Sequence, residues 1–378
     1  MTCYYPLRGW VSKKPNPSGK YSITFNRSEA QLDAETSVSC GQCIGCRLER
    51  SRIWALRCKH EASLHPHNSF ITLTYDDDNL PSDGSLVKKD FTQFMKNLRK
   101  RLVPKNPYSP RTPKGLKATD PKAFPNQELF DEWQFKNGIR FYMCGEYGLD
   151  QILADQGIEK IGRPHYHAIL FNFNPINQAE QIYSREEFMH DIPDIKKSDN
   201  KYGKFRKVEK TALGSPQWES SEIHFAWGKG RTRVSHFNMD AAAYVARYIT
   251  KKQTSGVTPE QELEFVEHYS KYEPETGTVV MVEPEYNNGS RNPGIAKNWF
   301  KAYKNDLRKG FLYVNGHKTL IPKYYESLME QDMDLSADLS NVKELRRIHL
   351  AQREEYCDEQ LRTSEKIKLK QIRNLKRD

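Results

Sequence analysis

Residues 162–171 read Gly-Arg-Pro-His-Tyr-His-Ala-Ile-Leu-Phe, and this stretch decides the interpretation of the chain. Its apolar second half is typical of a strand buried in a sheet. Residues i and i+2 of a strand share a face, so His165 and His167 present two imidazoles side by side. These imidazoles make two-thirds of a divalent metal site that still needs an acidic ligand.

The strand-like run before it supplies a carboxylate. Residues 139–146 read Ile-Arg-Phe-Tyr-Met-Cys-Gly-Glu, and a hairpin between the two runs would bring Glu146 near His165 and His167. Two imidazoles and one carboxylate leave open positions on Mg²⁺ or Mn²⁺, which then holds a phosphate oxygen as a Lewis acid. Zinc is also chemically compatible with these ligands. A histidine pair without a metal is the alternative for the His-x-His motif taken alone.

Two tyrosines follow on a segment that we expect to be helical. Residues 244–252 read Tyr-Val-Ala-Arg-Tyr-Ile-Thr-Lys-Lys, which places Tyr244 and Tyr248 one turn apart on one helix face. Tyrosine has an ordinary pKa near 10, so its attack on phosphorus needs a metal or a cation such as Lys251. That attack would leave a covalent phosphotyrosine and a free 3′-hydroxyl, and it would retain the bond energy for rejoining ends. An aromatic stripe packed in the core is the alternative.

Four of the seven cysteines cluster near the N-terminus, at Cys40, Cys43, Cys46 and Cys58. Their spacing predicts a structural zinc site, with His60 as a substitute for Cys58. An iron–sulfur cluster is a second interpretation, although its usual short fourth spacing is missing. Unligated thiols in a reducing cytoplasm are the third.

The order of elements predicts an α+β fold with a central, mainly antiparallel sheet flanked by helices. We expect strands at 70–75, 139–144, 162–171 and 223–227, and helices at 48–57, 91–102 and from about 238 onward. The predicted segments are a Cys-rich part at 1–65, a core at 66–300 with insertions near 104–137 and 174–220, and a helical, basic extension at 301–378.

Charge indicates the class of partner. The chain has 378 residues with 59 Lys and Arg against 49 Asp and Glu, a formal charge of +10 that favours a polyanion. No stretch approaches the roughly 20 apolar residues of a membrane span, and the N-terminus lacks a signal-peptide core. We therefore expect a cytoplasmic protein without a membrane partner. The basic tail at 362–377 is expected to be a solvated helix, with a DNA-binding arm as the alternative.

Together these motifs resemble the HUH endonucleases of rolling-circle replication, and most closely the replication initiation proteins of gokushovirus and microvirus-type single-stranded DNA phages. The first family motif is matched by the strand ending Thr-Leu-Thr-Tyr at 70–75, the second by His165 and His167, and the third, Tyr-x-x-x-Tyr-x-x-Lys, by residues 244–251. The family's Gly-Glu-Tyr-Gly corresponds to residues 145–148. Further matches are the Trp-Gly turn at 227–228 and Arg-Asn-Pro-Gly-Ile at 291–295.

The resemblance implies a metal-dependent single-strand DNA endonuclease with strand-transfer activity that initiates rolling-circle replication. It assigns Tyr244 and Tyr248 as nucleophiles beside Lys251, and Glu146 as the third metal ligand. It also implies single-stranded and origin DNA as partners, together with a host helicase and polymerase in a bacterial cytoplasm. A non-catalytic, zinc-containing nucleic-acid-binding protein and a metal hydrolase that uses water are the competing functions.

Overall fold

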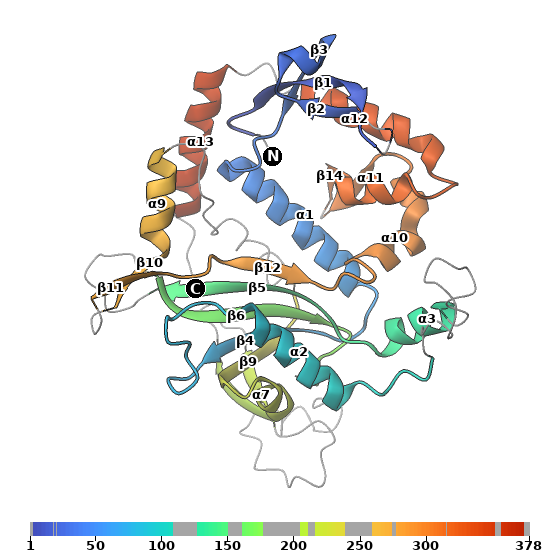
Figure 1. The fold of residues 1–378 in the computed structure, drawn as a ribbon. Coiled ribbons are helices and arrows are strands. Elements are labelled where there is room, and N and C mark those ends of the chain that lie inside the picture. Colours follow the sequence, from blue (N-terminus) through green and yellow to red (C-terminus); the bar gives the residue numbers. More distant parts are fainter. Residues whose placement is uncertain are drawn as a thin grey trace, which may run out of the picture. The chain divides into compact units, whose positions relative to one another are not determined.

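The computed structural model divides the chain into two compact units (Figure 1). Unit 1 combines Met1–Trp54 with Phe300–Arg377, and unit 2 is Ala55–Trp299 with Asp378. The sequence segments expected at the two ends of the chain therefore share one unit. The residues that the structure describes are 3–17, 19, 21–108, 127–149, 161–176, 205–210, 216–238, 259–273, 277–314, 316–351 and 357–373.

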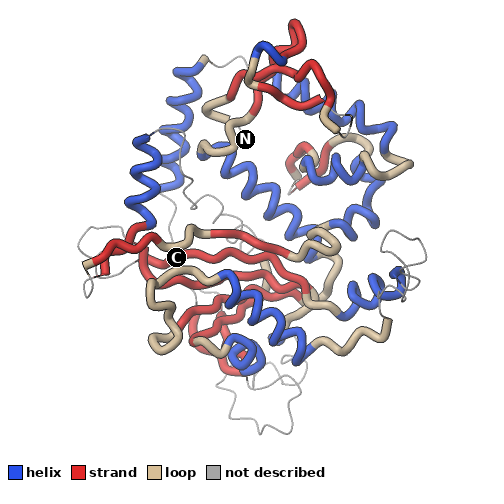
Figure 2. The backbone as a smooth tube through the Cα atoms, viewed as in Figure 1, coloured by secondary structure: helices blue, strands red, loops and turns tan. Residues whose placement is uncertain are grey.

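Unit 2 contains a seven-stranded antiparallel sheet with the strand order β12-β5-β6-β4-β9-β8-β7. Figure 2 shows these strands as adjacent segments with helices beside them. The α+β class with a mainly antiparallel sheet is therefore confirmed. In chain order the strands are β4 (Asn68–Tyr75), β5 (Arg140–Leu149), β6 (Ile161–Phe171), β7 (Phe205–Lys210), β8 (Pro216–Ser220), β9 (Gly230–His236) and β12 (Tyr286–Gly289).

One face of this sheet packs on helices α2 (Lys88–Leu102) and α7 (Ser221–Trp227). In β4, buried and half-buried residues alternate strictly, and Ile71, Leu73 and Tyr75 point into this core. A strand with one buried face requires this alternation, since successive side chains point to opposite sides. The opposite face therefore presents Thr72 and Thr74, and it is the face that carries the site.

Helix α7 corrects the expectation of a strand at 223–227. Ile223, Ala226 and Trp227 are buried at positions i, i+3 and i+4, which is helical spacing. A short apolar run does not distinguish the two periods by itself. The Trp-Gly turn is present, because Gly228 ends the helix in the left-handed conformation with a φ of 62°.

A buried ion pair joins helix α1 (Ile44–Ala62) to the sheet. Glu61 in α1 pairs with Arg140 in β5, and the Ala296 N–H donates to Glu61 Oε2 at 2.6 Å. The Arg140 guanidinium also donates to the Pro293 carbonyl at 2.7 Å, and Arg57 donates to the Ile295 carbonyl at 3.0 Å. These contacts explain the Arg-Asn-Pro-Gly-Ile motif, whose carbonyls fix the end of the core against α1 and β5.

The segments expected to be insertions are only partly described. Residues 109–126, 177–204 and 211–215 lie outside the described residues, whereas α3 (Gln127–Asn137) is a helix and β7 and β8 extend the sheet at one edge. The remaining elements of unit 2 are α9 (Pro259–Tyr269) and the pair β10 (Ser270–Glu273) and β11 (Thr278–Met281).

Unit 1 contains a three-stranded sheet of order β2-β1-β3, and it extends to the basic tail. The expected tail helix is present as α13 (Asp358–Arg373). No described helix is long and apolar enough to cross a membrane. The elements are β1 (Leu7–Pro15), β2 (Tyr21–Thr24), η1 (Arg27–Glu29), β3 (Ala30–Val38), η3 (Lys304–Leu307), β13 (Phe311–Val314), β14 (His317–Leu320), α11 (Lys323–Met329), η4 (Ser336–Asp338), α12 (Leu339–Ala351) and α13; α10 (Lys297–Tyr303) and α1 each contain a unit boundary.

Candidate active site

Strands β5 and β6 bring Glu146, His165 and His167 together. Glu146 lies directly opposite His165 in the antiparallel register, and Cys144 lies opposite His167. Cross-strand partners share a face, so the carboxylate and both imidazoles project from the same side of the sheet. The hairpin expected from the sequence is therefore present, although residues 150–160 of its connection lie outside the described residues.

One oxygen of Glu146 contacts both histidines. Its Oε1 is 2.7 Å from His165 Nε2 and 2.9 Å from His167 Nε2. The carboxyl group is 3% exposed, while the His165 side chain is 16% exposed and forms the most open part of the cluster. Burial raises the pKa of a carboxyl group, but the two histidine contacts outweigh it here and lower the pKa of Glu146 to about 2. The group is an anion at neutral pH.

The second ring nitrogen of each histidine is also engaged. His167 Nδ1 is 2.9 Å from the Thr72 hydroxyl, and His165 Nδ1 is 3.2 Å from the Arg163 carbonyl. These contacts turn both Nε2 atoms toward Glu146. Metal-binding histidines are commonly oriented in this way, with the outer nitrogen bonded to a neighbouring oxygen.

Tyr166, between the two histidines, anchors the strand on the opposite face. It is fully buried, and its hydroxyl is 2.9 Å from the Tyr75 hydroxyl and accepts from the Val87 N–H at 2.9 Å. Because successive strand residues alternate, fixing Tyr166 in the core fixes the direction of both imidazoles. The His-Tyr-His sequence thus couples site geometry to core packing.

The donor set fits a divalent cation. The ligand atoms of Glu146, His165 and His167 lie within 4.8 Å of one another, and two nitrogens with one carboxylate oxygen suit Mg²⁺, Mn²⁺ or Zn²⁺. Three protein ligands also leave coordination positions for a substrate. A buried carboxylate needs a positive partner, and a cation between these groups provides one.

Two arginines that the sequence analysis missed lie on the same face. Arg233 of β9 is the cross-strand partner of Thr72, and Arg231 is the partner of Thr74, which itself pairs with His165. Arg233 forms an ion pair with Glu219, whereas the Arg231 residue is exposed. The alternation Gly-Arg-Thr-Arg-Val at 230–234 carried the signal, because its arginines occupy alternate strand positions.

Comparison with known proteins identifies the family. Residues 68–253 match the model of a family described as replication-associated protein ORF2. The chain is 26% identical over 328 residues to replication-associated protein VP4 of Bdellovibrio phage phiMH2K, covering 86% of this chain and 76% of that protein. It is 25% identical over 361 residues to replication-associated protein ORF2 of Spiroplasma virus 4, covering 92% and 86%. The chain belongs with the replication-associated proteins of microvirus-type phages.

A third relative of this family is replication-associated protein ORF4 of Chlamydia phage 1. It is 23% identical over 295 residues, which cover 78% of this chain and 54% of that protein. No solved structure matches the chain. The matched family range contains the metal-site residues and the double-tyrosine motif.

The expected nucleophiles lie outside the described residues. Tyr244, Tyr248 and Lys251 fall in the range 239–258, so their assignment remains a prediction from the motif. The described chain reaches Asn238, two residues beyond the end of β9. Strand β9 carries Arg231 and Arg233 and leads directly into the tyrosine segment.

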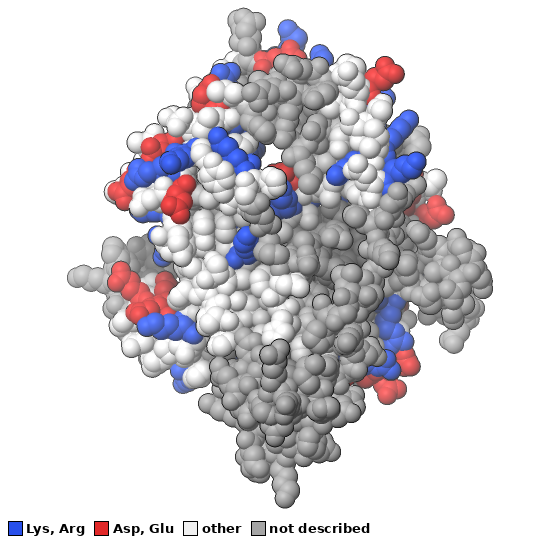
Figure 3. All heavy atoms as spheres, turned by 180° about the vertical axis from the view of Figure 1, so that it is seen from behind, with Lys and Arg blue, Asp and Glu red and all other residues white. Residues whose placement is uncertain are grey.

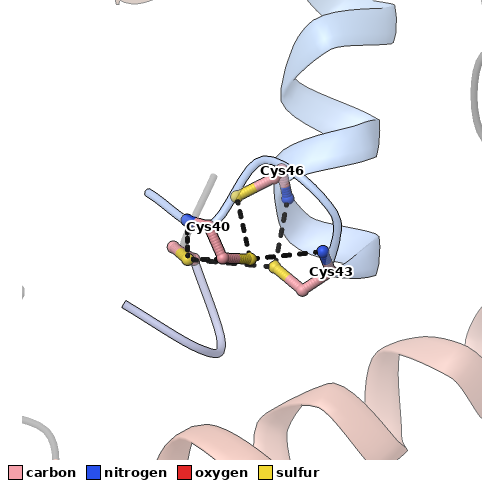
Figure 4. Close-up of side chains that lie close together, drawn as sticks. Cys40, Cys43 and Cys46 are labelled. Atoms are coloured by element: carbon pink, nitrogen blue, oxygen red, sulfur yellow. Dashed lines mark hydrogen bonds between the residues drawn. The ribbon is translucent and has the colours of Figure 1, made fainter. Parts of the chain in front are cut away.

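A second candidate metal site lies in unit 1, where four cysteine sulfurs converge. Figure 4 shows the sulfur atoms of Cys40, Cys43 and Cys46 turned toward one another where helix α1 begins. The fourth sulfur belongs to Cys3, which is 3.6 Å from Cys40 and 3.9 Å from Cys43, while Cys40 and Cys46 are 3.9 Å apart. Tetrahedral zinc with bonds of about 2.3 Å spaces its sulfurs by about 3.8 Å, so these distances fit one zinc ion.

The cysteine backbone supports the same arrangement. The N–H groups of Cys40 and Cys43 donate to Cys3 Sγ and Cys40 Sγ at 3.3 Å, and that of Tyr4 donates to Cys43 Sγ at 3.3 Å. Hydrogen bonds from Cys3 and Cys46 lower the pKa of the Cys43 thiol, which favours the thiolate that binds metal. An iron–sulfur cluster would hold its thiolates further apart, around several iron and sulfide atoms.

The structure corrects the fourth cysteine of this site. Cys58 is fully buried in α1, twelve residues beyond Cys46, which corresponds to about 18 Å along a helix. His60 does not substitute for it, because its ring stacks on Trp299 at 3.6 Å between centroids. The sequence analysis chose Cys58 for its proximity, whereas strand pairing brings in Cys3.

Proposed function

We propose that this chain initiates phage DNA replication by nicking single-stranded DNA with a tyrosine nucleophile. The observation that carries the proposal is the buried cluster of Glu146, His165 and His167, found in one family-matched range with the Tyr-x-x-x-Tyr-x-x-Lys motif. The relatives are named as replication-associated proteins of phages, which supports the replication role.

Glu146, His165 and His167 would hold Mg²⁺ or Mn²⁺ through one carboxylate and two Nε2 atoms. A divalent ion bound there supplies Lewis acidity toward a non-bridging phosphate oxygen. Thr72 and the Arg163 carbonyl keep the imidazoles oriented for this purpose. The burial of Glu146 keeps its charge from being screened by solvent.

In the proposed step, the hydroxyl oxygen of Tyr244 or Tyr248 attacks phosphorus. A bond forms between the tyrosine oxygen and phosphorus, the bond from phosphorus to the 3′-oxygen breaks, and that oxygen takes up a proton as the tyrosine proton leaves. Lys251 lowers the cost of the tyrosine anion by its positive charge. The products are a 5′-phosphotyrosine and a free 3′-hydroxyl, which a host polymerase extends behind a host helicase.

The same site runs in reverse to rejoin ends. A 3′-hydroxyl attacks the phosphotyrosine, and the phosphodiester forms as the tyrosine leaves, so no ATP is needed. With two tyrosines, one holds a 5′ end while the other cleaves again.

Exposed Arg231 adds a phosphate contact to the proposed DNA path. It lies two strands from His165 on the metal-site face, so the two Cα atoms are separated by about 10 Å. A guanidinium at that distance reaches the backbone of a strand whose scissile phosphate lies at the histidines. On the side of the molecule seen in Figure 3, the described basic and acidic side chains are intermixed and form no continuous basic patch.

The test is nicking of the single-stranded circular genome that encodes this chain, in the presence of Mn²⁺. We expect linear DNA whose 3′ end a polymerase extends and whose 5′ end is blocked by protein. The variant carrying both Tyr244→Phe and Tyr248→Phe should lose nicking, and Tyr313→Phe, at an exposed tyrosine, should retain it. Nicking without a protein-blocked 5′ end would indicate a water-using hydrolase, and binding without nicking would indicate a non-catalytic zinc-containing protein.

A further inference from the structure

We propose that the three-stranded sheet of unit 1 binds single-stranded DNA by base stacking. The site is the aromatic face, which we define as Leu7 of β1, Tyr21 and Ile23 of β2, and Phe25, arranged over Gly9. This binding surface requires neither the metal of unit 2 nor the tyrosine motif, so it stands or falls independently of the nicking chemistry.

Strand register places these side chains on one side of the sheet. Val11 lies opposite Ile23, and alternation puts Leu7 and Gly9 on the same side as Val11. Tyr21 shares the side of Ile23 for the same reason. Phe25 reaches this side too, because a Cβ atom added to Gly9 would lie 3.2 Å from the Phe25 ring and 2.9 Å from the Ile23 side chain. Glycine at position 9 lets Phe25 and Ile23 lie close to the backbone of β1.

The face is open to solvent. Tyr21 is 57% exposed and Phe25 is 59% exposed, and Leu7 and Ile23 also count among the exposed large hydrophobic residues. Single exposed apolar residues are ordinary, but four on one side of a small sheet form a patch of the kind that binds a partner. Tyr21 and Phe25 are four residues apart, so their Cα atoms are separated by about 13 Å along an extended strand.

The charge around the face selects a polyanion. Residues 1–28 contain five Lys and Arg and no Asp or Glu. Arg8, Lys13 and Lys14 of the central strand are exposed, and the Arg27 guanidinium lies 5.6 Å from the centre of the Trp10 ring. Aromatic side chains beside basic ones are the combination that single-stranded nucleic-acid sites use, with rings for bases and cations for phosphates.

Single-stranded DNA fits this surface better than duplex DNA. Stacking on Tyr21 and Phe25 requires unpaired bases with a free face, and a duplex offers free faces only at its ends. Nicking and strand displacement produce such single strands, so the ligand would be present wherever this protein works. Because every base has a stacking face, we expect little dependence on sequence.

The test is fluorescence anisotropy of the full chain with a labelled oligo(dT) of about 30 nucleotides, long enough for the site sizes of single-strand-binding surfaces, without divalent metal so that no cleavage contributes. Stacking is worth about 1–3 kcal/mol per base, so the variant Tyr21→Ala with Phe25→Ala should bind at least about tenfold more weakly. The matched control is Tyr313→Ala, an exposed aromatic residue of β13 in the same unit that is 69% exposed. Tyr21→Phe should retain wild-type affinity, because it keeps the ring.

A second readout separates stacking from charge. The aromatic variant should keep the wild-type slope of log affinity against log salt, since it keeps the phosphate contacts, whereas Lys13→Gln with Lys14→Gln should reduce that slope. Unchanged affinity in the aromatic variant would overturn the proposal. So would an aromatic variant that binds DNA normally but converts a dimer to a monomer in sedimentation, because the face would then be a protein interface.

Discussion

Glu146 lies directly opposite His165 in the pairing of β5 and β6, and its Oε1 is 2.7 Å from His165 Nε2. The two residues are separated by 18 others in the sequence and meet because the strands form an antiparallel hairpin. A one-residue slip of this register would turn the carboxylate to the opposite face of the sheet. The strand pairing therefore determines whether the site exists.

Replacing Glu146 should remove most of the metal affinity. We expect Glu146→Gln to weaken Mn²⁺ binding by more than about 100-fold, because the loss of a ligand exceeds the effect of about 10–100-fold typical of an outer contact. Titration calorimetry measures this directly. Glu283→Gln, at an exposed carboxylate that pairs with Lys88, is the matched control and should bind Mn²⁺ normally. Equal affinity in both variants would remove Glu146 from the site.

The Thr72 hydroxyl should act as a positioning group for His167. Its Oγ1 is 2.9 Å from His167 Nδ1, so Thr72→Val keeps the side-chain shape and removes the contact. We expect Mn²⁺ affinity to fall by about 10-fold in Thr72→Val and to be restored in Thr72→Ser. If the serine variant binds as weakly as the valine variant, the hydroxyl has no part in orienting the ring.

Metal removal should act on the small sheet of unit 1. Cys3 precedes β1 and Cys40 follows β3, so an ion held by both closes the two ends of that sheet. We expect Cys3→Ser to lose the bound zinc of about one per chain by elemental analysis and to raise amide exchange across β1 and β3. Strand β4 should keep its protection. Cys58→Ala should retain zinc, and loss of zinc there instead would restore the assignment made from sequence.

The buried pair of Glu61 and Arg140 should make stability depend on pH. Burial raises the pKa of Glu61, but its hydrogen bond with His65, the charge of Arg140 and the Ala296 N–H outweigh it, so the folded pKa lies below the ordinary 4.5. The stabilisation by this group is thus present above pH 4.5 and is lost as the pH falls through the folded value. Arg140→Met leaves the carboxylate unpaired and should cost about 3–5 kcal/mol near neutral pH.

Urea unfolding near neutral pH and near pH 5 checks this sign. Between these conditions the contribution of Glu61 should stay constant in the wild type, whereas Arg140→Met should recover stability as its carboxyl group takes up a proton. The gap between the two proteins should therefore narrow toward acid. The control Arg347→Met, at an exposed arginine, should show a gap near zero at both values. A gap for Arg140→Met that widens in acid would contradict the assignment.

The metal-site strands could be predicted from the sequence because their signals are local. The period-two alternation around His165 and His167 indicates a strand, and the apolar run ending at Glu146 indicates its neighbour. Only a hairpin of adjacent strands was needed to join them. Thr72 and Arg231 were missed, because their roles depend on which strands β4 contacts, and that order is not written in any one segment.

The cysteine site shows where local reasoning failed. Proximity in sequence favoured Cys58, yet an uninterrupted helix from Ile44 to Ala62 carries it away from Cys46. Cys3 joins through the pairing of β1 and β3, whose register places Leu7 opposite Val38. Contacts that depend on such distant pairing are not visible in residue spacing, although an apolar strand beginning just after Cys3 was a usable signal.

The most direct test of the central claim is mass spectrometry of the protein–DNA conjugate formed with Mn²⁺ and digested with nuclease and trypsin. Cleavage after Arg233, Arg247 and Lys251 yields peptides 234–247 and 248–251, which carry Tyr244 and Tyr248 separately. We predict a nucleotide remnant on one or both of these peptides, absent in His165→Ala. A remnant on a different peptide, or nicked DNA without any conjugated peptide, would contradict tyrosine attack at this site.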